Sequence, residues 1–176
     1  MFLKININCL DFHIFSFLFF ISKLIKIYFA IAFLLNGLFF TNCNNIIMFD
    51  FSWYQSLIQP PLAPPAWLFA PVWTILYISM AVALFLYARK TSYKSKAWGY
   101  VLFFTQLLVN FAWTPAFFGV KNITLALAIV ILLDILVLFN IIEFFKVSKT
   151  SARILIPYFI WIVFATYLNF GILFLN

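Results

Sequence analysis

The chain has 176 residues, of which 67% are hydrophobic and only 9% are charged, and its mean hydropathy is +1.13. These values lie far outside the range of soluble domains, so we expect an integral membrane protein of the all-α class. The formal net charge of +7 does not indicate nucleic-acid binding, because the basic residues lie at the ends of apolar runs, where they set membrane topology.

Residues 1–26 read as an N-terminal extension of the membrane domain, which we place at residues 27–176. The apolar run of the extension has about 11 residues, whereas a spanning helix needs about 20. It resembles the core of a signal peptide, but no small-residue cleavage site follows it. Two explanations stay open, namely an amphipathic anchor and a start codon assigned upstream of the true one.

Five apolar segments of the membrane domain are long enough to cross a bilayer, and together they predict a five-transmembrane-helix bundle. We place them at about 27–47, 67–88, 97–118, 123–145 and 151–175. The N-terminal lysines and the loops after the second and fourth spans hold ten basic residues, whereas the opposite side holds only Lys121. The positive-inside rule therefore places the N-terminus and both basic loops in the cytoplasm, and the C-terminus outside.

The connection between the first and second spans lies within WYQSLIQPPLAPPAWLFAPVWTILY, residues 53–77, which holds five prolines and no charged side chain. Each proline fixes its own φ and disfavours helix at the residue before it, so Ser56 to Ala66 should form a stiff, non-helical loop. Irregular backbone is costly against lipid, so we expect this loop at the water interface or over the mouth of the bundle. An uncharged aromatic lid of this kind suits a pocket for a flat apolar ligand.

Three of the predicted spans each carry one stripe that combines an aromatic ring with a polar or soft side chain. Helical spacings of three and four place the members of each stripe on one face. The stripes either line a ligand pocket or simply form helix contacts, and the tryptophans deep in their spans favour the pocket. Trp53, Trp67 and Trp98 fit the interfacial aromatic belt instead. The members of the stripes are Trp73, Tyr77 and Met80; Gln106, Asn110, Trp113 and Phe117; and Trp161, Ala165 and Asn169.

Asp134 lies near the middle of the fourth predicted span, where a carboxylate costs about 2.5 to 3.5 kcal/mol on insertion scales. It is a candidate for proton movement, and the alternative is a protonated acid bonded to a neighbouring helix. A small proton-coupled carrier or channel that uses Asp134 is therefore the rival function.

Ordinary enzyme chemistry finds no support in the sequence. Cys9, Cys43 and His13 do not form a metal-ligand spacing, so we expect no metal site and no obligatory cofactor. Neither a nucleophile with its base nor a phosphate-binding loop is visible. An enzyme of the hydrolytic type is therefore not expected.

Three segments resemble the TspO/MBR family, which comprises the tryptophan-rich sensory proteins of bacteria and the mitochondrial translocator protein, also known as the peripheral-type benzodiazepine receptor. Residues 53–77 are similar to its first loop and second helix. QLLVNFAWTPAFFG, residues 106–119, and PYFIWIVFATYLNF, residues 157–170, resemble its third and fifth helices. The resemblance covers about residue 27 to the end, in the right order and spacing.

The resemblance implies a homodimeric membrane receptor or sensor that binds porphyrins or haem in a cavity capped by the first loop. Transport of the porphyrin and its light-dependent degradation both stay open as activities, and Trp73 and Trp161 match the tryptophans linked to degradation. The implied location is a bacterial inner membrane or a mitochondrial outer membrane. The expected ligand-binding residues, from the resemblance and the stripes together, are Trp53, Trp67, Ala70, Trp73, Tyr77, Gln106, Asn110, Trp113, Trp161, Ala165, Leu168 and Asn169.

The chain also departs from the family pattern at several positions. Phe111 stands where many members have tryptophan, and Gln59 replaces a common lysine that could meet a porphyrin carboxylate. Ala63 and Ala66 stand where animal members carry histidines, which weakens the case for haem ligation. No basic residue follows Phe170, so the sterol-recognition pattern is incomplete and we do not predict specific sterol binding.

Overall fold

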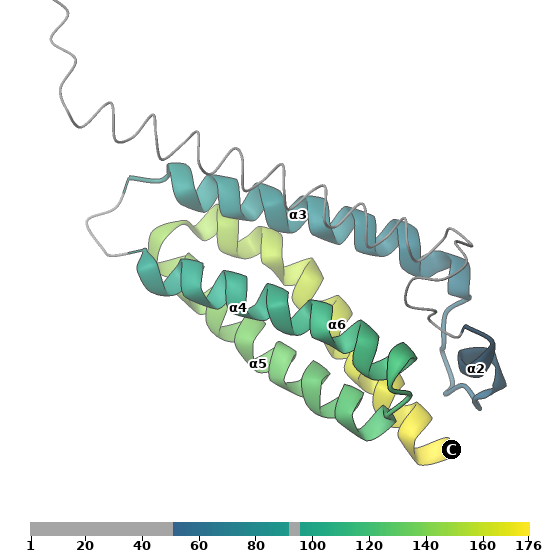
Figure 1. The fold of residues 1–176 in the computed structure, drawn as a ribbon. Coiled ribbons are helices and arrows are strands. Elements are labelled where there is room, and N and C mark those ends of the chain that lie inside the picture. The colour runs from purple at the N-terminus through teal and green to yellow at the C-terminus, as the bar shows by residue number, and fades with distance from the viewer. Residues whose placement is uncertain (1–50, 92–95) are drawn as a thin grey trace, which may run out of the picture. The chain divides into compact units, whose positions relative to one another are not determined.

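The computed structural model describes residues 51–91 and 96–176, and the regular secondary structure in these ranges is entirely helical (Figure 1). A short helix, α2 (Phe51–Ser56), precedes the proline loop, and a 3₁₀ turn, η1 (Ala66–Leu68), leads out of it. The long helices are α3 (Phe69–Arg89), α4 (Ala97–Thr114), α5 (Ile123–Val147) and α6 (Lys149–Leu175).

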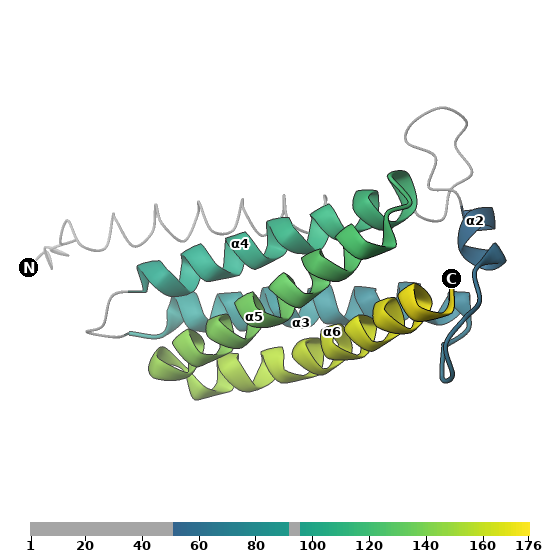
Figure 2. The same cartoon turned by 90° about the horizontal axis from the view of Figure 1, so that it is seen from below.

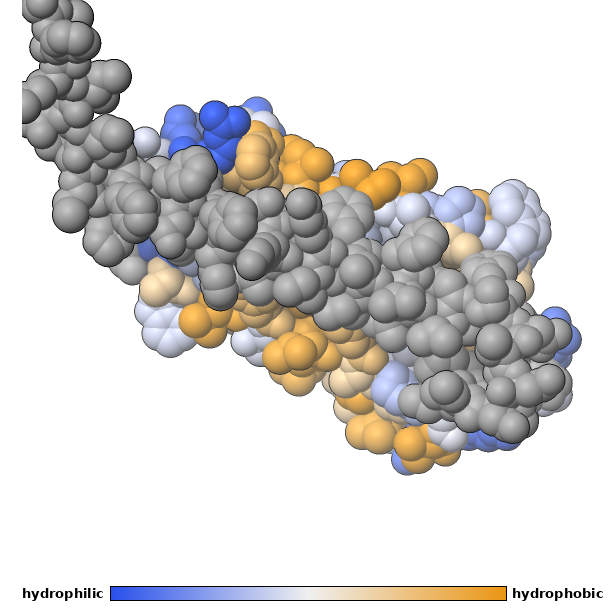
Figure 3. Space-filling view, turned by 45° about the horizontal axis from the view of Figure 1, so that its top comes forward, coloured by the Kyte–Doolittle hydropathy of each residue, from blue (hydrophilic) through white to orange (hydrophobic). Residues whose placement is uncertain are grey.

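Four segments of the described part are long and apolar enough to cross a membrane, namely Ala66–Arg89, Ala97–Gly119, Ile123–Val147 and Lys149–Leu175. These segments confirm an all-helical membrane protein and agree with the last four predicted spans. Figure 3 shows hydrophobic residues along the middle of the visible face and hydrophilic residues near its ends, as expected for a surface in lipid. The first predicted span, 27–47, and the extension 1–26 lie outside the described residues, so the five-helix count stays a prediction.

The long helices pack in the order α4, α5, α6, α3, with each helix against the next (Figures 1 and 2). The tightest connection is Ser148, which ends α5 and begins α6 by accepting a hydrogen bond from the Ser151 N–H. α3 and α4 are joined through side chains instead, since the Tyr77 ring lies 6.2 Å from the Phe111 ring, centroid to centroid. The spacing of α3 and α4 is therefore set by large side chains at their interface.

The end of the bundle that holds the α3–α4 and α5–α6 connections is fixed by an aromatic stack. The rings of Tyr87 and Phe144 lie parallel with centroids 4.0 Å apart, and Phe103 continues the stack at 6.1 Å from Phe144. Gly99 leaves the space for the Tyr87 hydroxyl, because a Cβ at position 99 would lie 2.3 Å from that oxygen. Asn140 donates a hydrogen bond of 3.0 Å to the Gly99 carbonyl, so α3, α4 and α5 meet here.

The opposite end of α4 is a π-helical turn, η2 (Pro115–Gly119), that the sequence analysis did not predict. The Val120 N–H donates to the Pro115 carbonyl at 2.9 Å, which closes the wide turn. Its effect is to bury Phe117 and Phe118, which are 1% and 5% exposed, next to the loop end of the bundle. Asn122 then begins α5 by accepting a hydrogen bond from the Leu125 N–H at 2.9 Å.

The proline loop runs between α2 and η1, as predicted, and it is attached to α6 at successive points. The Tyr167 hydroxyl donates to the Pro61 carbonyl at 2.8 Å. The amide of Asn176 accepts from the Ile58 N–H at 2.9 Å and donates to the Ile58 carbonyl at 3.2 Å. The loop therefore runs antiparallel to the last turns of α6, which hold it in place.

Between these two attachments, Pro60 is buried against Gly171. A Cβ at position 171 would lie 2.5 Å from the Pro60 Cβ and 2.9 Å from its Cγ, and a proline ring has little freedom to move away. Glycine is thus required at this close contact between loop and helix.

We predict that Gly171→Ala displaces the loop from α6 while the bundle stays folded. Overpacking of this kind costs about 1 to 3 kcal/mol, and a movement of the loop away from α6 relieves it. Amide hydrogen exchange in the segment 57–63 should rise, whereas exchange in α5 should not change. Gly119→Ala is the matched control, because a Cβ there meets nothing closer than 4.0 Å. Equal exchange in the wild type and Gly171→Ala would refute this role of Gly171.

Candidate functional site

A directed chain of hydrogen bonds links α3, α4 and α6 in the middle of the bundle. The Tyr77 hydroxyl donates to Asn110 Oδ1 at 2.9 Å, and Asn110 Nδ2 donates to the Tyr158 hydroxyl at 3.2 Å. Tyr158 in turn donates to Gln106 Oε1 at 2.8 Å. Gln106 and Asn110 are buried side by side because they lie four residues apart on α4, as the stripe predicted.

Trp73 covers this polar chain from α3. Its ring stacks on Tyr77 with centroids 5.5 Å apart and meets the Tyr158 ring edge-on at 6.4 Å. The Trp73 ring therefore faces the neighbouring helices. The other members of the α3 stripe also face the bundle, since Met80 is fully buried and Tyr77 bonds Asn110 of α4.

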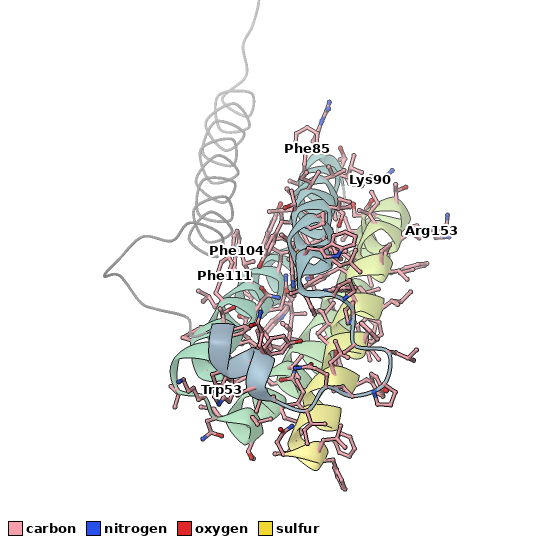
Figure 4. The ribbon with its side chains drawn as sticks, turned by 90° about the vertical axis from the view of Figure 1, so that its right-hand side faces the viewer. Trp53, Phe85, Lys90, Phe104, Phe111 and Arg153 are labelled. Carbon is pink, nitrogen blue, oxygen red and sulfur yellow. The ribbon has the colours of Figure 1, made fainter. Side chains whose placement is uncertain are left out.

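Trp113 lies on α4, nearer the proline loop, and connects the helices to the aromatic residues below the loop. Its indole N–H points to Asn169 Oδ1 on α6 at 3.4 Å, and its ring stacks on Phe117 at 5.1 Å. Trp53, which is labelled beside α2 in Figure 4, meets Phe117 edge-on with ring centroids 5.4 Å apart. α2 is thus held to the end of α4 by ring contacts.

Trp161 lies on α6 and carries a buried indole N–H that has no acceptor among the residues the structure describes. Its ring contacts Phe69, at the start of α3, at 6.0 Å and Phe164 at 5.6 Å. A buried donor without a partner costs about 1 to 3 kcal/mol. The position is therefore one where an added acceptor would stabilise the protein.

Of the other predicted site residues, three lie on the helices of the cluster and one, Trp67, lies apart from it. Ala165 belongs to the Trp161 stripe of α6 and Leu168 lies beside it, and the Ala165 carbonyl accepts a bond of 2.8 Å from Asn169 Nδ2. Ala70 lies in the first turn of α3, where its carbonyl accepts from Thr74. Trp67 does not join the cluster, because it is 68% exposed at the loop end, where it fits the interfacial belt.

Two residues of the site were not predicted. Tyr158 makes two of the three bonds in the chain, and Phe69 covers Trp161. Helical spacing was a usable signal for Tyr158, because it precedes Trp161 by three residues and so lies on the same side of α6. Gln59, which stands where relatives were expected to carry lysine, donates from Nε2 to the Tyr54 carbonyl at 3.1 Å and closes the start of the loop.

Asp134 takes no part in this cluster. Its Oδ2 accepts a hydrogen bond of 2.7 Å from Thr166 on α6, and within the two described ranges no basic side chain pairs with it. Asp134 is thus bonded to a neighbouring helix through one oxygen, and its other oxygen, Oδ1, is buried without a partner among the described residues. The described ranges also contain no group of three His, Cys, Asp or Glu side chains that could hold a metal ion.

Comparison with known proteins identifies the family of this chain. The model of the TspO/MBR family matches residues 24–175. The chain is 43% identical over 128 residues to the tryptophan-rich protein TspO of Chlorobaculum tepidum, which covers 71% of this chain and 80% of that one. It is 40% identical over 125 residues to the protein of the same name from Archaeoglobus fulgidus, covering 71% and 80%. It is 34% identical over 122 residues to the translocator protein of Bos taurus, covering 68% and 72%. With the match extending over nearly the whole sequence, this chain belongs to the TspO/MBR family.

Proposed function

We propose that this protein is a membrane receptor that binds a flat tetrapyrrole such as a porphyrin among the rings of Trp73, Trp113 and Trp161, beneath the proline loop. The observation that carries the proposal is that three tryptophans from three different helices all contact neighbouring helices: Trp73 meets Tyr158, Trp113 meets Asn169 and Trp161 meets Phe69.

Ring stacking and burial would supply most of the affinity. Each Å² of apolar surface removed from water contributes about 25 cal/mol, and aromatic pairs add about 0.5 to 1.5 kcal/mol each. α3 and α4 are suited to admit such a ligand, because Tyr77 joins them through side chains, which can change rotamer, rather than through close backbone packing.

Polar recognition would come from two donors that lack partners. The Trp161 indole N–H and Gln106 Nε2 are both buried and have no acceptor in the described part of the chain. A carbonyl or carboxylate oxygen of the ligand would satisfy either donor. Since hydrogen bonds to charged groups are worth about 1.5 to 3 kcal/mol, we expect an anionic porphyrin to bind more tightly than its ester.

The names of the relatives suggest what binding is for. One relative, 35% identical, is called tryptophan-rich sensory protein, and another is called translocator protein. Sensing, transport and light-dependent degradation of the porphyrin all require that the ligand binds first. We also expect this chain to act as a homodimer, which light scattering of the purified protein would test.

A titration with protoporphyrin IX, followed by tryptophan fluorescence, tests the proposal directly. We expect saturable quenching, because three tryptophans would lie against the bound ring. Protoporphyrin IX dimethyl ester is the matched comparison and should bind more weakly. Quenching that does not saturate would refute the proposed function.

For the photochemistry, we predict that Trp73→Phe combined with Trp161→Phe abolishes light-dependent porphyrin degradation. Binding should weaken but remain measurable, since phenylalanine keeps part of the stacking surface. Absorbance of bound protoporphyrin during illumination gives the readout. Trp98→Phe is the control, because Trp98 is 69% exposed at the far end of α4. Degradation at the wild-type rate in the double variant would remove both residues from the mechanism.

We predict that Tyr158→Phe weakens both the bundle and the site. The substitution removes one hydroxyl but leaves Asn110 Nδ2 and Gln106 Oε1 without their partner. Hydrogen bonds between membrane helices are worth about 0.6 kcal/mol on average and at most about 1.7, so we expect a loss of about 1 kcal/mol in the unfolding free energy. Thermal unfolding in detergent measures it. Tyr100→Phe is the control, because the buried Tyr100 hydroxyl has no partner in the described ranges.

A further inference from the structure

The basic residues of the described part gather at one end of the bundle, away from the proposed ligand site. The end of α3, the start of α4 and the α5–α6 connection lie together in both views of the ribbon (Figures 1 and 2). Six of the seven described Lys and Arg residues lie at this end, and only Lys121 lies at the other. They are Arg89, Lys90, Lys96, Lys146, Lys149 and Arg153.

Two of these six charges are already used within the chain. Lys146 forms an ion pair with Glu143, one turn earlier on α5. Lys96 donates from Nζ to the Ala88 carbonyl at 3.0 Å and lies 5.9 Å from the centre of the Tyr87 ring. Neither ammonium group is therefore free to recognise a partner.

The remaining four, Arg89, Lys90, Lys149 and Arg153, are exposed and form no ion pair within the described ranges. We call these four residues the basic collar. In Figure 4 the side chains of Lys90 and Arg153 extend outward from the ends of α3 and α6. The Arg89 guanidinium carbon lies over the Phe85 ring, 5.4 Å from its centre, so the apolar stem of Arg89 runs along the exposed hydrophobic surface of α3.

Two of the collar charges, Lys149 and Arg153, are not stabilised by the helix that carries them, α6. Lys149 is the first residue of α6 and Arg153 follows one turn later, and the first turn contains no acidic residue. A helix N-terminus carries a positive partial charge, so cations placed there are unfavourable and an anion would be favourable. An external anion would therefore stabilise this end of the molecule.

Trp98 indicates the depth of the collar in the membrane. It lies at the start of α4, at the same end of the bundle, and is 69% exposed. Exposed tryptophan at the end of a membrane helix lies at the level of the lipid headgroups. The collar is therefore at the height of lipid phosphates rather than deep in water.

We propose that the basic collar selects anionic phospholipids in the leaflet at this end, so that their headgroups occupy positions next to Arg89, Lys90, Lys149 and Arg153. Electrostatic attraction to an anionic leaflet is worth about 1 kcal/mol per basic residue, or about fivefold in affinity, and it is screened by salt. This selection does not depend on tetrapyrrole binding and goes beyond the proposed function.

The test uses lipids with brominated chains, which quench nearby tryptophan. The full chain is reconstituted in phosphatidylcholine vesicles containing a small fraction of brominated phosphatidylglycerol or, separately, brominated phosphatidylcholine. The contribution of Trp98 is obtained by subtracting the fluorescence quenching of the Trp98→Phe variant from that of the wild type. We expect about fivefold enrichment of phosphatidylglycerol over phosphatidylcholine near Trp98, which 1 M salt reduces. Equal quenching by both lipids in the wild type overturns the proposal.

Variants assign the effect to the collar. Replacing its four residues with glutamine should abolish the enrichment, whereas Lys121→Gln, at the other end, should not change it. Removing four basic residues can also change how the chain inserts into the membrane. The double variant Arg89→Lys with Arg153→Lys therefore serves as a second test, because it keeps the charge and should keep the enrichment. Inorganic phosphate at constant ionic strength should not compete. Competition by phosphate, or enrichment that survives in the correctly folded glutamine variant, would refute lipid selection by the collar.

Discussion

A polar side chain between membrane helices has no water to bond, so it must find its partner on another helix. In this protein the Tyr158 hydroxyl meets that requirement for α4 by accepting from Asn110 and donating to Gln106. Asn110 passes the connection on to Tyr77 of α3. A single hydroxyl on α6 therefore fixes the amides of α4 and, through them, the position of α3. The rings of Tyr77 and Phe111 then set how closely α3 and α4 approach each other. Because this spacing is wide, tryptophan side chains fit between the helices.

The same helix controls the proline loop. Tyr167, Gly171 and Asn176 contact Pro61, Pro60 and Ile58 in antiparallel order along the last turns of α6. Prolines make the loop stiff, so three attachments position all of it. On the side facing α4, Asn169 receives the Trp113 indole N–H at 3.4 Å. α6 thus positions both the rings below the loop and the loop itself, and any movement of α6 would change the two together.

The parts of this arrangement that follow local rules were predictable from sequence. Apolar length predicted the four described spans, and spacings of three and four placed Gln106, Asn110 and Trp113 on one face of α4. The spacing of residues along a helix does not show which residue of a neighbouring helix each polar side chain bonds. Nothing in the α6 pattern alone shows that Tyr158 rather than Asn169 bonds Asn110, because that depends on the rotation of α6 relative to α4. The π-helical turn at Pro115 was missed for a similar reason, since its stabilisation comes from the burial of Phe117 and Phe118 against other elements. Trp67 was assigned to the ligand site by resemblance, although the belt interpretation of the same residue agrees better with its exposure.

Two of the buried side-chain groups without a hydrogen-bond partner among the described residues, on Trp161 and Gln106, lie in the candidate site, whereas the Tyr100 hydroxyl lies near the other end of α4. The amides of Asn110 and Asn140 and the hydroxyl of Thr166 each donate a hydrogen bond to a neighbouring helix, and so stabilise the fold without any ligand. Trp161 and Gln106 instead leave one N–H each without a partner among the described residues, at a cost of about 1 to 3 kcal/mol for each donor. Alanine or leucine at these positions would avoid that cost at similar burial. Sequences usually violate a local rule of this kind where function requires it. Gln106 bonds Tyr158, which meets the Trp73 ring, and Trp161 lies about one turn further along α6 from Tyr158. Under the proposed function, a ligand that brings its own acceptors would regain the free energy lost at these donors, so the site would favour ligands that combine a flat ring with an oxygen at its edge.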